Sequence, residues 1–230
     1  MNAQEYCLQV DKNEREQKAL IETTPIKEDN SPLISLKNSG FNLILEPSIK
    51  KNYNYFVREA VVEKIGRISN KLDKENKVLI IRSAWRSFRH QRLLWVRHFE
   101  IICKKHPEKH LKEIRDITSN FIAAKKQSMH STGGAVDALI YDLKNDCIMD
   151  FGTNDGYTIT LTEKCYPHYP DISEHAKQNR KLLINLFEEE DFVCDLKEYW
   201  HFDYGNALWA IEKGRDHAIY GKRGRAPGQA

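Results

Sequence analysis

Helical and strand-like segments follow one another in this chain without the strict β-α-β alternation that is typical of a parallel sheet. Apolar residues recur at three- and four-residue steps from Tyr55 to Leu72, a period that predicts an amphipathic helix. The apolar run over 77–81 then predicts a short buried strand. This irregular order favours an α+β fold, in which helices pack on a small, mostly antiparallel sheet.

The rest of the chain continues this mixed pattern. A helix that begins near Ser87 should end at His106, because Pro107 cannot continue it. The other expected elements are helices over 109–126 and 173–189, strands over 135–141 and 193–204, and a Gly/Asn/Asp-rich loop over 151–156. Residues 1–30 are polar and show no sustained period, so we expect a partly disordered extension before a single domain over 31–230.

The composition argues against nucleic acid and membranes as partners. A net charge of +3 over 230 residues is small, and the basic residues within 213–225 are interpreted as a solvated end. No stretch approaches the roughly 18 apolar residues that a membrane span needs. The N-terminus has no basic region followed by an apolar run, so we expect no secretory signal and a cytoplasmic location. The sequence leaves the oligomeric state open.

The five cysteines are odd in number and widely spaced, and they form no Cys-x-x-Cys pair. This pattern argues against a disulfide framework and against a cysteine zinc site, and it fits reduced thiols.

Two segments have side chains suited to a metal-dependent hydrolase. In 128–137, SMHSTGGAVD, His130 and Asp137 lie on either side of two glycines, which permit a tight bend that aims both side chains at one point. The second segment, 198–201, EYWH, ends in His201. A hydrolytic zinc takes three nitrogen or oxygen ligands and keeps a fourth position for water. We therefore predict one zinc per chain, held by His130, Asp137 and His201.

Catalysis at such a zinc also needs a base and a positive charge. Glu198 lies three residues before His201, so both can reach the metal only if the backbone bends or bulges there. Zinc lowers the pKa of its bound water to about 7, and Glu198 is placed to take that proton and pass it to the leaving amine. Arg86, at the end of a predicted strand, is the candidate to stabilise the developing oxyanion.

Each of these residues also has an ordinary structural interpretation. Asp137 could simply end a strand, and Glu198 could be an exposed strand residue. A single histidine is usually a surface or core residue, and we interpret the others in that way: His90, His98, His106, His110, His168, His175 and His217. The two motifs in combination are much less expected by chance than either motif alone.

The motifs resemble those of a known family. SMHSTGGAVD resembles the Ser-x-His-x-x-Gly-x-Ala-x-Asp motif of the zinc D-alanyl-D-alanine dipeptidases, which include the vancomycin-resistance type, and of the related D,D-carboxypeptidases. The segment 198–210, EYWHFDYGNALWA, resembles the dipeptidases' Glu-Trp-Trp-His-Phe-x-Tyr-Gly region. The segment 84–95, AWRSFRHQRLLW, is similar to their Gly-Tyr-Arg-Pro region. The resemblance extends from about Pro32 to Gly221.

This resemblance implies the same roles for the three ligands, for Glu198 as general acid/base and for Arg86 as the transition-state arginine. It adds Ser128, which matches a serine that helps to hold the dipeptide. It also adds Asp155, which lies one position early relative to an aspartate that receives the substrate ammonium. Two departures leave the substrate in question: 83–87 reads SAWRS where the family has Asp-Gly-Tyr-Arg-Pro, and Tyr199 replaces the first tryptophan.

The sequence therefore predicts a zinc metallopeptidase, with its zinc in a central cleft, that hydrolyses D-alanyl-D-alanine or a similar small D-amino-acid dipeptide through a zinc-bound water. One alternative is a zinc D,D-carboxypeptidase or endopeptidase that acts on peptidoglycan peptides. A closed cleft would favour the dipeptide, and an open cleft the longer peptide. The other alternative is a non-catalytic zinc- or peptidoglycan-binding module, which would need neither Glu198 nor Arg86.

Overall fold

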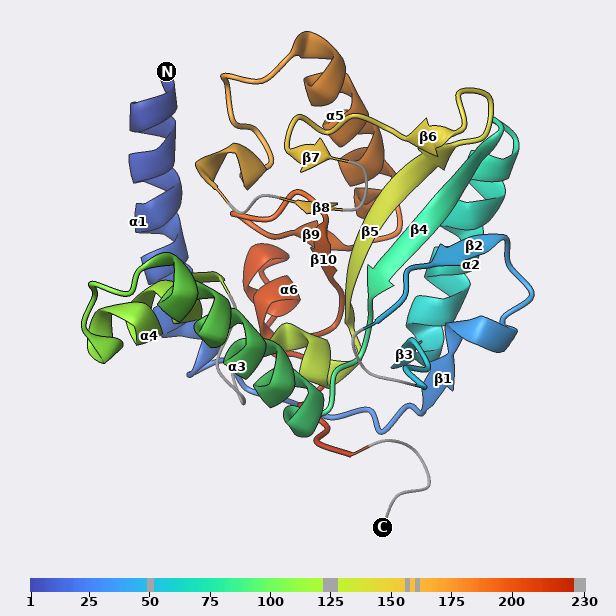
Figure 1. Ribbon diagram of the computed structural model, residues 1–230. Helices are drawn as coiled ribbons and strands as arrows, with labels where there is room; N and C mark the ends of the chain where they lie inside the picture. Colours follow the sequence, from blue (N-terminus) through green and yellow to red (C-terminus); the bar gives the residue numbers. More distant parts are fainter. Residues whose placement is uncertain (49–51, 122–127, 156–157, 160–161, 226–230) are drawn as a thin grey trace.

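A six-stranded sheet lies at the centre of the computed structural model, which describes residues 1–48, 52–121, 128–155, 158–159 and 162–225 (Figure 1). The strand order is β2-β4-β5-β10-β9, and β6 also pairs with β5. β2 runs parallel to β4, and the other pairs are antiparallel. The strands are β2 (Leu43–Leu45), β4 (Lys77–Ser83), β5 (Ala135–Asp142), β6 (Cys147–Ile148), β9 (Val193–Cys194) and β10 (His201–Asp203). This mixed, mostly antiparallel sheet confirms the predicted α+β class.

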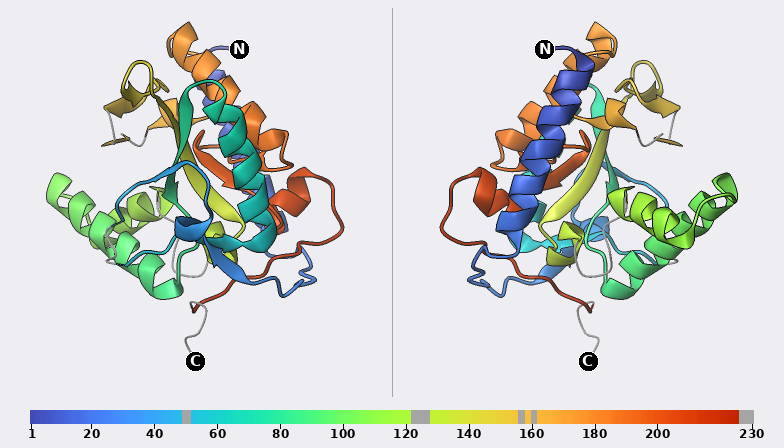
Figure 2. Two further views of the ribbon diagram at one scale, coloured as in Figure 1. Left: turned by 90° about the vertical axis from the view of Figure 1, so that its right-hand side faces the viewer. Right: turned by 90° about the vertical axis from the view of Figure 1, so that its left-hand side faces the viewer.

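Helices cover both sides of the sheet. α2 (Glu59–Asp73) and α5 (Glu174–Glu188) lie on one side, and the hairpin of α3 (Phe88–Lys105) and α4 (Leu111–Phe121) lies on the other (Figure 2). The remaining elements are α1 (Ala3–Ile21), α6 (Ala207–Glu212), the strand pairs β1 (Leu33–Ser35) with β3 (Phe56–Arg58) and β7 (Asn154–Asp155) with β8 (Thr158–Ile159), and the 3-10 turns η1 (Leu36–Asn38), η2 (Met129–Thr132) and η3 (Glu163–Cys165). Among the described helices, none combines the length and apolar character that a membrane crossing requires.

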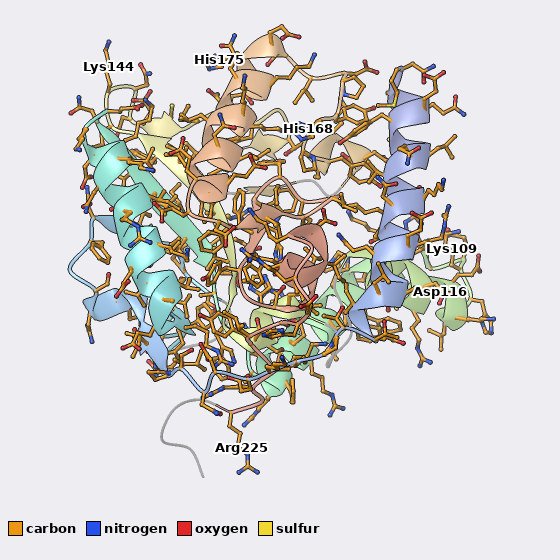
Figure 3. The ribbon with its side chains drawn as sticks, turned by 180° about the vertical axis from the view of Figure 1, so that it is seen from behind. Lys109, Asp116, Lys144, His168, His175 and Arg225 are labelled. Carbon is orange, nitrogen blue, oxygen red and sulfur yellow. The ribbon has the colours of Figure 1, made fainter. Side chains whose placement is uncertain are left out.

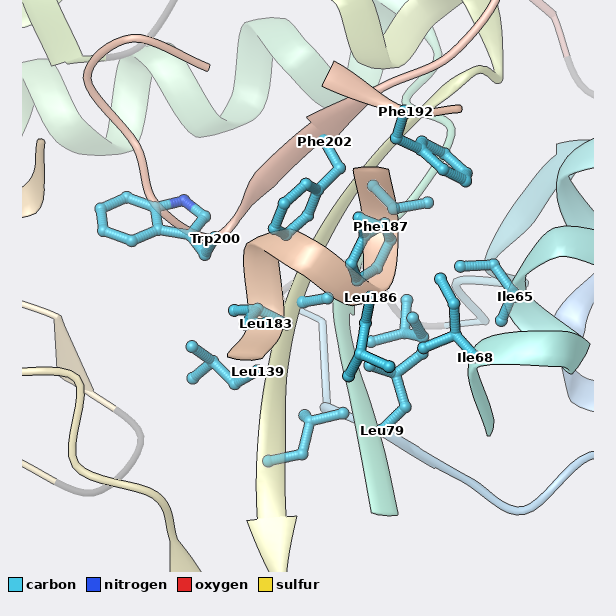
Figure 4. Close-up of a cluster of buried hydrophobic side chains, with 14 of the residues drawn as sticks. Ile65, Ile68, Leu79, Leu139, Leu183, Leu186, Phe187, Phe192, Trp200 and Phe202 are labelled. Carbon is cyan, nitrogen blue, oxygen red and sulfur yellow. The ribbon is translucent and has the colours of Figure 1, made fainter. Parts of the chain in front are cut away.

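The main core lies between the sheet and the two helices α2 and α5. Ile65 and Ile68 of α2 face Phe187 of α5, and Phe187 packs against Phe202 of β10 (Figure 4). The rings of Phe187 and Phe202 are stacked, with centroids 3.8 Å apart. Burial of one such side chain contributes about 1.5–3 kcal/mol. Because side chains alternate along a strand, anchoring Phe202 in the core directs its neighbour His201 to the opposite face.

The helix starts were well predicted where a local cap defines them. The Ser87 hydroxyl accepts a hydrogen bond from the His90 N–H at the start of α3, and Ser173 does the same for Ala176 in α5. The strands expected over 77–81 and 135–141 are confirmed as β4 and β5. Of the helix expected over 109–126, α4 accounts for Leu111–Phe121, and 122–126 lie outside the described residues.

Two expectations are wrong because pairing with distant segments overrides the local pattern. The apolar residues at 56–57 do not begin the helix: Phe56–Arg58 is β3, paired with β1, and its Phe56 carbonyl accepts from Trp85 N–H at 2.8 Å. Within the loop expected over 151–156, Asn154–Asp155 forms β7 and pairs with β8.

The expectation of a partly disordered N-terminus is also wrong, since Ala3–Ile21 forms helix α1. A capping box begins it, in which Glu5 N–H donates to Asn2 Oδ1 and Asn2 N–H donates to Glu5 Oε2. The division of the chain into 1–30 and 31–230 stays a prediction.

Candidate metal centre and active site

The turn before β5 gives the first two predicted ligands their direction. His130 lies in η2, and Gly133 closes this turn with a φ of +79°, a conformation that favours glycine. A Cβ atom on Gly134 would overlap the Tyr204 carbonyl, so this position also needs glycine. The predicted tight bend is therefore present, and Asp137 follows on β5.

The third ligand comes from the neighbouring strand. His201 is paired directly with Asp137 across β10 and β5. His201 Nδ1 lies 2.9 Å from Asp137 Oδ1, and His130 Nε2 lies 3.3 Å from Asp137 Oδ2. One ligand atom from each of the three residues falls within 4.8 Å of the others, and all three residues are buried. The structure thus brings together the predicted ligand set. No other group of His, Cys, Asp or Glu in the described part of the chain has this spacing.

Contacts behind the two rings fix which nitrogen faces the centre. His130 Nδ1 is 3.0 Å from the Ala84 carbonyl oxygen, which leaves Nε2 directed inward. His201 Nε2 is 3.1 Å from Asp203 Oδ2, which leaves Nδ1 directed inward. Such outer partners orient ligating imidazoles. The sequence prediction missed Asp203, although its position two residues after His201 on one strand places both side chains on the same face.

The electrostatics of the centre act differently on the two histidines. Burial alone would lower the pKa of His201, but the carboxylates of Asp203 and Asp137 raise it well above its usual value, so a metal ion would have to displace a proton from this ring. Burial and the nearby Arg86 guanidinium lower the pKa of His130 to about 4, so its ring is neutral and can act as a ligand. Burial alone would raise the pKa of Asp137, but the imidazoles of His130 and His201 hold it well below its usual value. Two imidazole nitrogens and an ionised carboxylate, all buried, form the donor set that zinc takes in hydrolytic sites. The residues present therefore fit a zinc ion.

A turn between β9 and β10 places Glu198 beside these ligands. The Asp195 carboxylate accepts hydrogen bonds from the N–H groups of Lys197 and Glu198, at 2.7 and 3.0 Å, and His201 N–H donates to the Glu198 carbonyl oxygen. Glu198 Oε2 consequently lies 3.9 Å from His201 Nδ1. The predicted backbone irregularity is confirmed, and a single continuous strand over 193–204 is wrong, because this turn separates β9 from β10.

Glu198 has the properties of a group that exchanges protons near neutral pH. Burial raises the pKa of its carboxyl group to about 8, and the carboxylates of Asp195 and Asp137 add to the shift. Its side chain is still 32% exposed, compared with 10% for Asp137, so its carboxylate is the more open of the two to solvent.

Arg86 is held at the end of β4 with its guanidinium against the centre. Nη2 donates to Asp137 Oδ2 at 2.8 Å, and Nε donates to Ser83 Oγ at 2.8 Å. Gln91 accepts from Nη1 at 3.4 Å. Ser83 and Gln91, which the sequence prediction did not assign, therefore fix the direction of Arg86.

The structure says less about the two residues predicted to bind the substrate, Ser128 and Asp155. Ser128 is buried, with 5% exposure, immediately before η2, and its side chain does not cap that turn. Asp155 lies in β7, but its side chain is outside the described part of the structure, so its predicted role stays a prediction. Tyr199, where the dipeptidases have tryptophan, is fully buried, and its hydroxyl is 3.0 Å from Thr153 Oγ1. Tyr199 therefore belongs to the core beneath the turn.

Comparison with known proteins decides the family. The sequence profile of the Peptidase M15 family, described as D-ala-D-ala dipeptidase, matches residues 44–219. The chain belongs to this metallopeptidase family. It is 28% identical over 86 residues to a D-alanyl-D-alanine dipeptidase of Enterococcus faecalis (strain ATCC 700802 / V583), a stretch that covers 37% of this chain and 40% of that protein. It is 29% identical over 104 residues to a D-alanyl-D-alanine dipeptidase of Synechocystis sp. (strain ATCC 27184 / PCC 6803 / Kazusa), with 40% of each protein covered. The matched stretches thus span well under half the length of these relatives.

Comparison with solved structures also finds matches at low sequence identity. A mutant of the vancomycin-resistance D,D-pentapeptidase VanY in complex with Zn(II) has a TM-score of 0.48 and 13% identity, over 84% of this chain and 90% of that one. VanYB in complex with D-alanine-D-alanine has a TM-score of 0.48 and 13% identity, over 82% of this chain and 87% of that one.

Proposed function

We propose that this M15 family member is a zinc peptidase that hydrolyses D-alanyl-D-alanine or a similar small D-amino-acid dipeptide. One observation supports it above all: Glu198 and Arg86 meet at the same buried centre as His130, Asp137 and His201. A pure binding module would need three ligands, but it would need neither a carboxyl group of raised pKa nor a fixed guanidinium at the metal.

The residues present divide the work of hydrolysis among them. His130 Nε2, a carboxylate oxygen of Asp137 and His201 Nδ1 would hold one zinc per chain. When bound, zinc supplies Lewis-acid activation of a water molecule and of the scissile carbonyl group.

Glu198 is the general base and then the general acid. Its carboxylate takes a proton as the water oxygen bonds to the carbonyl carbon, and it returns that proton to the amine nitrogen as the C–N bond breaks. Burial raises the pKa of this carboxyl group, which favours the protonated form that Glu198 holds between the two steps. Glu198 is therefore again a carboxylate at the end of each turnover.

Arg86 stabilises the negative charge that develops on the carbonyl oxygen. Its guanidinium is fixed by Ser83 and Asp137, so little reorganisation is needed when the charge appears. Ser128 and Asp155 are assigned to the substrate: the dipeptide's ammonium pairs with the Asp155 carboxylate, and Ser128 supplies a hydrogen bond.

A D,D-carboxypeptidase or endopeptidase acting on peptidoglycan peptides is the second candidate. It is favoured by the segment 83–87, SAWRS, which departs from the dipeptidases' Asp-Gly-Tyr-Arg-Pro. The two candidates share the zinc centre and differ in whether the substrate has a free ammonium next to the scissile bond.

Three substrates separate these candidates. Zinc-loaded protein is incubated with D-Ala-D-Ala, with N-acetyl-D-Ala-D-Ala and with a pentapeptide that ends in D-Ala-D-Ala, and released D-alanine is measured. The dipeptidase proposal expects rapid cleavage of the free dipeptide alone. Equal cleavage of the free and acetylated forms, or a preference for the pentapeptide, contradicts it and favours the carboxypeptidase.

A further inference from the structure

Helix α1 is docked on the body of the protein near Glu198. Its Val10 and Gln17 are buried, and Gln17 Nε2 donates to Glu212 Oε1 of α6 at 2.7 Å. Figure 1 shows α1 running along one side of the molecule, and Figure 3 shows the same helix from behind, next to His168. This helix lies before residue 44, where the match to the M15 family begins.

Two acidic residues of α1 bind the residue that precedes Glu198. Lys197 Nζ lies 2.8 Å from Asp11 Oδ1 and 3.0 Å from Glu14 Oε2. The side chains of Lys197, Glu14 and Asp11 are 26%, 24% and 40% exposed, less than those of the solvated Lys12–Glu16 pair on the same helix, at 63% and 65%. Exposed pairs contribute little, whereas partly buried pairs with two acceptors fix a side chain more firmly.

The ion pairs act on the turn that carries the base. The N–H groups of Lys197 and Glu198 both donate to the same Asp195 oxygen, so an anchor on Lys197 restrains the Glu198 backbone directly. Burial alone would lower the pKa of Lys197, but hydrogen bonds with Asp11 and Glu14 raise it, which keeps the ammonium charged.

A second set of α1 contacts involves Tyr166, whose ring centroid lies 5.6 Å from Lys197 Nζ. Tyr6 OH accepts a hydrogen bond from His168 N–H at 3.1 Å, and the Tyr6 ring lies 6.4 Å from the Tyr166 ring between centroids. The segment that contains Tyr166 also contains Cys165, whose carbonyl oxygen accepts from Tyr199 N–H at 3.1 Å. Helix α1 therefore contacts Lys197 directly and is linked to Tyr199 through the segment 165–168.

We infer that α1 is a positioning element for catalysis, in which Asp11 and Glu14 bind Lys197 and so hold the Asp195–Trp200 turn where Glu198 reaches the metal centre. The inference rests on the proposed function for its kinetic consequence. Its structural consequence, a more mobile turn when the ion pairs are lost, does not depend on any substrate.

The test uses two sets of variants: one removes the charges of the α1 carboxylates with little change in side-chain size, and the other reverses charges across the ion pairs. In Asp11→Asn/Glu14→Gln both acceptors become neutral amides of nearly the same size, and Glu16→Gln on the exposed face of α1 is the matched control. Each protein is measured for zinc content, for amide hydrogen exchange over 195–200, and for kcat and KM. A second pair consists of Lys197→Glu and the triple variant Asp11→Lys/Glu14→Lys/Lys197→Glu, which restores opposite charges.

We expect the double variant to keep its zinc, to exchange the Lys197 and Glu198 amides faster, and to lose about tenfold in kcat with KM nearly unchanged, since small misplacements of a catalytic group are costly. The control should match the wild type, and the triple variant should recover at least part of what Lys197→Glu loses. Unchanged exchange and kcat, with only a lower melting temperature, would overturn the inference and leave α1 as a stabilising helix. If the wild type cleaves none of the peptides, the proposed function fails, and the exchange measurement still decides the role of α1.

Discussion

Asp137 and His201 face one another across β5 and β10, and Asp137 Oδ1 lies 2.9 Å from His201 Nδ1. The register of this strand pair therefore determines the metal centre. A shift of one residue would move His201 to the other face of the sheet. Burial of the neighbouring Phe202 in the core stabilises the observed register.

The first prediction concerns the ligands. In His130→Ala/His201→Ala two of the three donors are lost, so metal analysis of the purified protein should find almost no zinc, against one zinc per chain in the wild type. His175→Ala, on α5, is the control and should keep its zinc. Full zinc occupancy in the double variant would show that the ligand assignment is wrong.

A second prediction tests how the core supports the centre. Phe202→Ala removes a fully buried ring stacked on Phe187 and should lower the free energy of unfolding by about 3–5 kcal/mol, as measured by urea denaturation. Because Phe202 and His201 are adjacent, zinc affinity should fall as well. Phe202→Leu should be milder in both respects. Normal zinc affinity in a destabilised but folded Phe202→Ala protein would show that packing of Phe202 is not needed to position His201.

The third prediction concerns stability and pH. Arg58 is fully buried and pairs with Glu28, at 2.6 Å between Nη1 and Oε1. Burial alone would raise the pKa of Glu28, but hydrogen bonds from Arg58 and from the Gly221 N–H lower it. A carboxyl group whose pKa is lower in the folded state stabilises the fold fully above its unfolded pKa of about 4.3, and this stabilisation is lost as the pH falls through the folded value.

Glu28→Gln should consequently be less stable than the wild type by about 1.5–3 kcal/mol near neutral pH, and the difference should shrink below about pH 4. Urea denaturation at a series of pH values measures it. A difference that is constant down to pH 3 would mean that the Glu28 charge contributes nothing.

The fourth prediction concerns recognition of the substrate ammonium. Asp155→Ala should cripple cleavage of D-Ala-D-Ala, because an ammonium that is desolvated without a carboxylate partner costs several kcal/mol, and zinc content should stay normal. Asp116→Ala, on the exposed surface of α4, is the control. If Asp155→Ala cleaves the dipeptide normally, Asp155 has no role in binding the ammonium and is only a residue of strand β7.

The sequence could predict the features that depend on interactions between residues close together in the chain. Ser87 and Ser173 cap helices through bonds to residues three positions away, so both helix starts were predictable. The capping box of Asn2 and Glu5 is equally local, and it was overlooked because the helix that follows is largely polar. That His130, Asp137 and His201 meet at one centre was predictable because two histidines and a carboxylate form a donor set that a hydrolytic zinc takes.

Long-range contacts account for what the sequence could not predict. Phe56 is extended because β3 pairs with β1, and nothing near Phe56 in the sequence indicates that partner. The contact of Lys197 with Asp11 joins residues far apart in the chain. Asp203 could have been found from its spacing to His201, but its role depends on which ring nitrogen faces the metal, and that requires the folded geometry.

The most direct test of the proposed mechanism is to measure zinc content and D-Ala-D-Ala turnover on the same preparations of wild type and Glu198→Gln. The substituted side chain has nearly the same size, and Glu198 is not a ligand, so we expect both proteins to bind one zinc per chain. Turnover should be clear in the wild type and lower by at least about 10²-fold in Glu198→Gln, the low end of the effect of removing a general acid/base. Near-normal turnover by a zinc-loaded Glu198→Gln protein, or no turnover by the zinc-loaded wild type, would contradict the account.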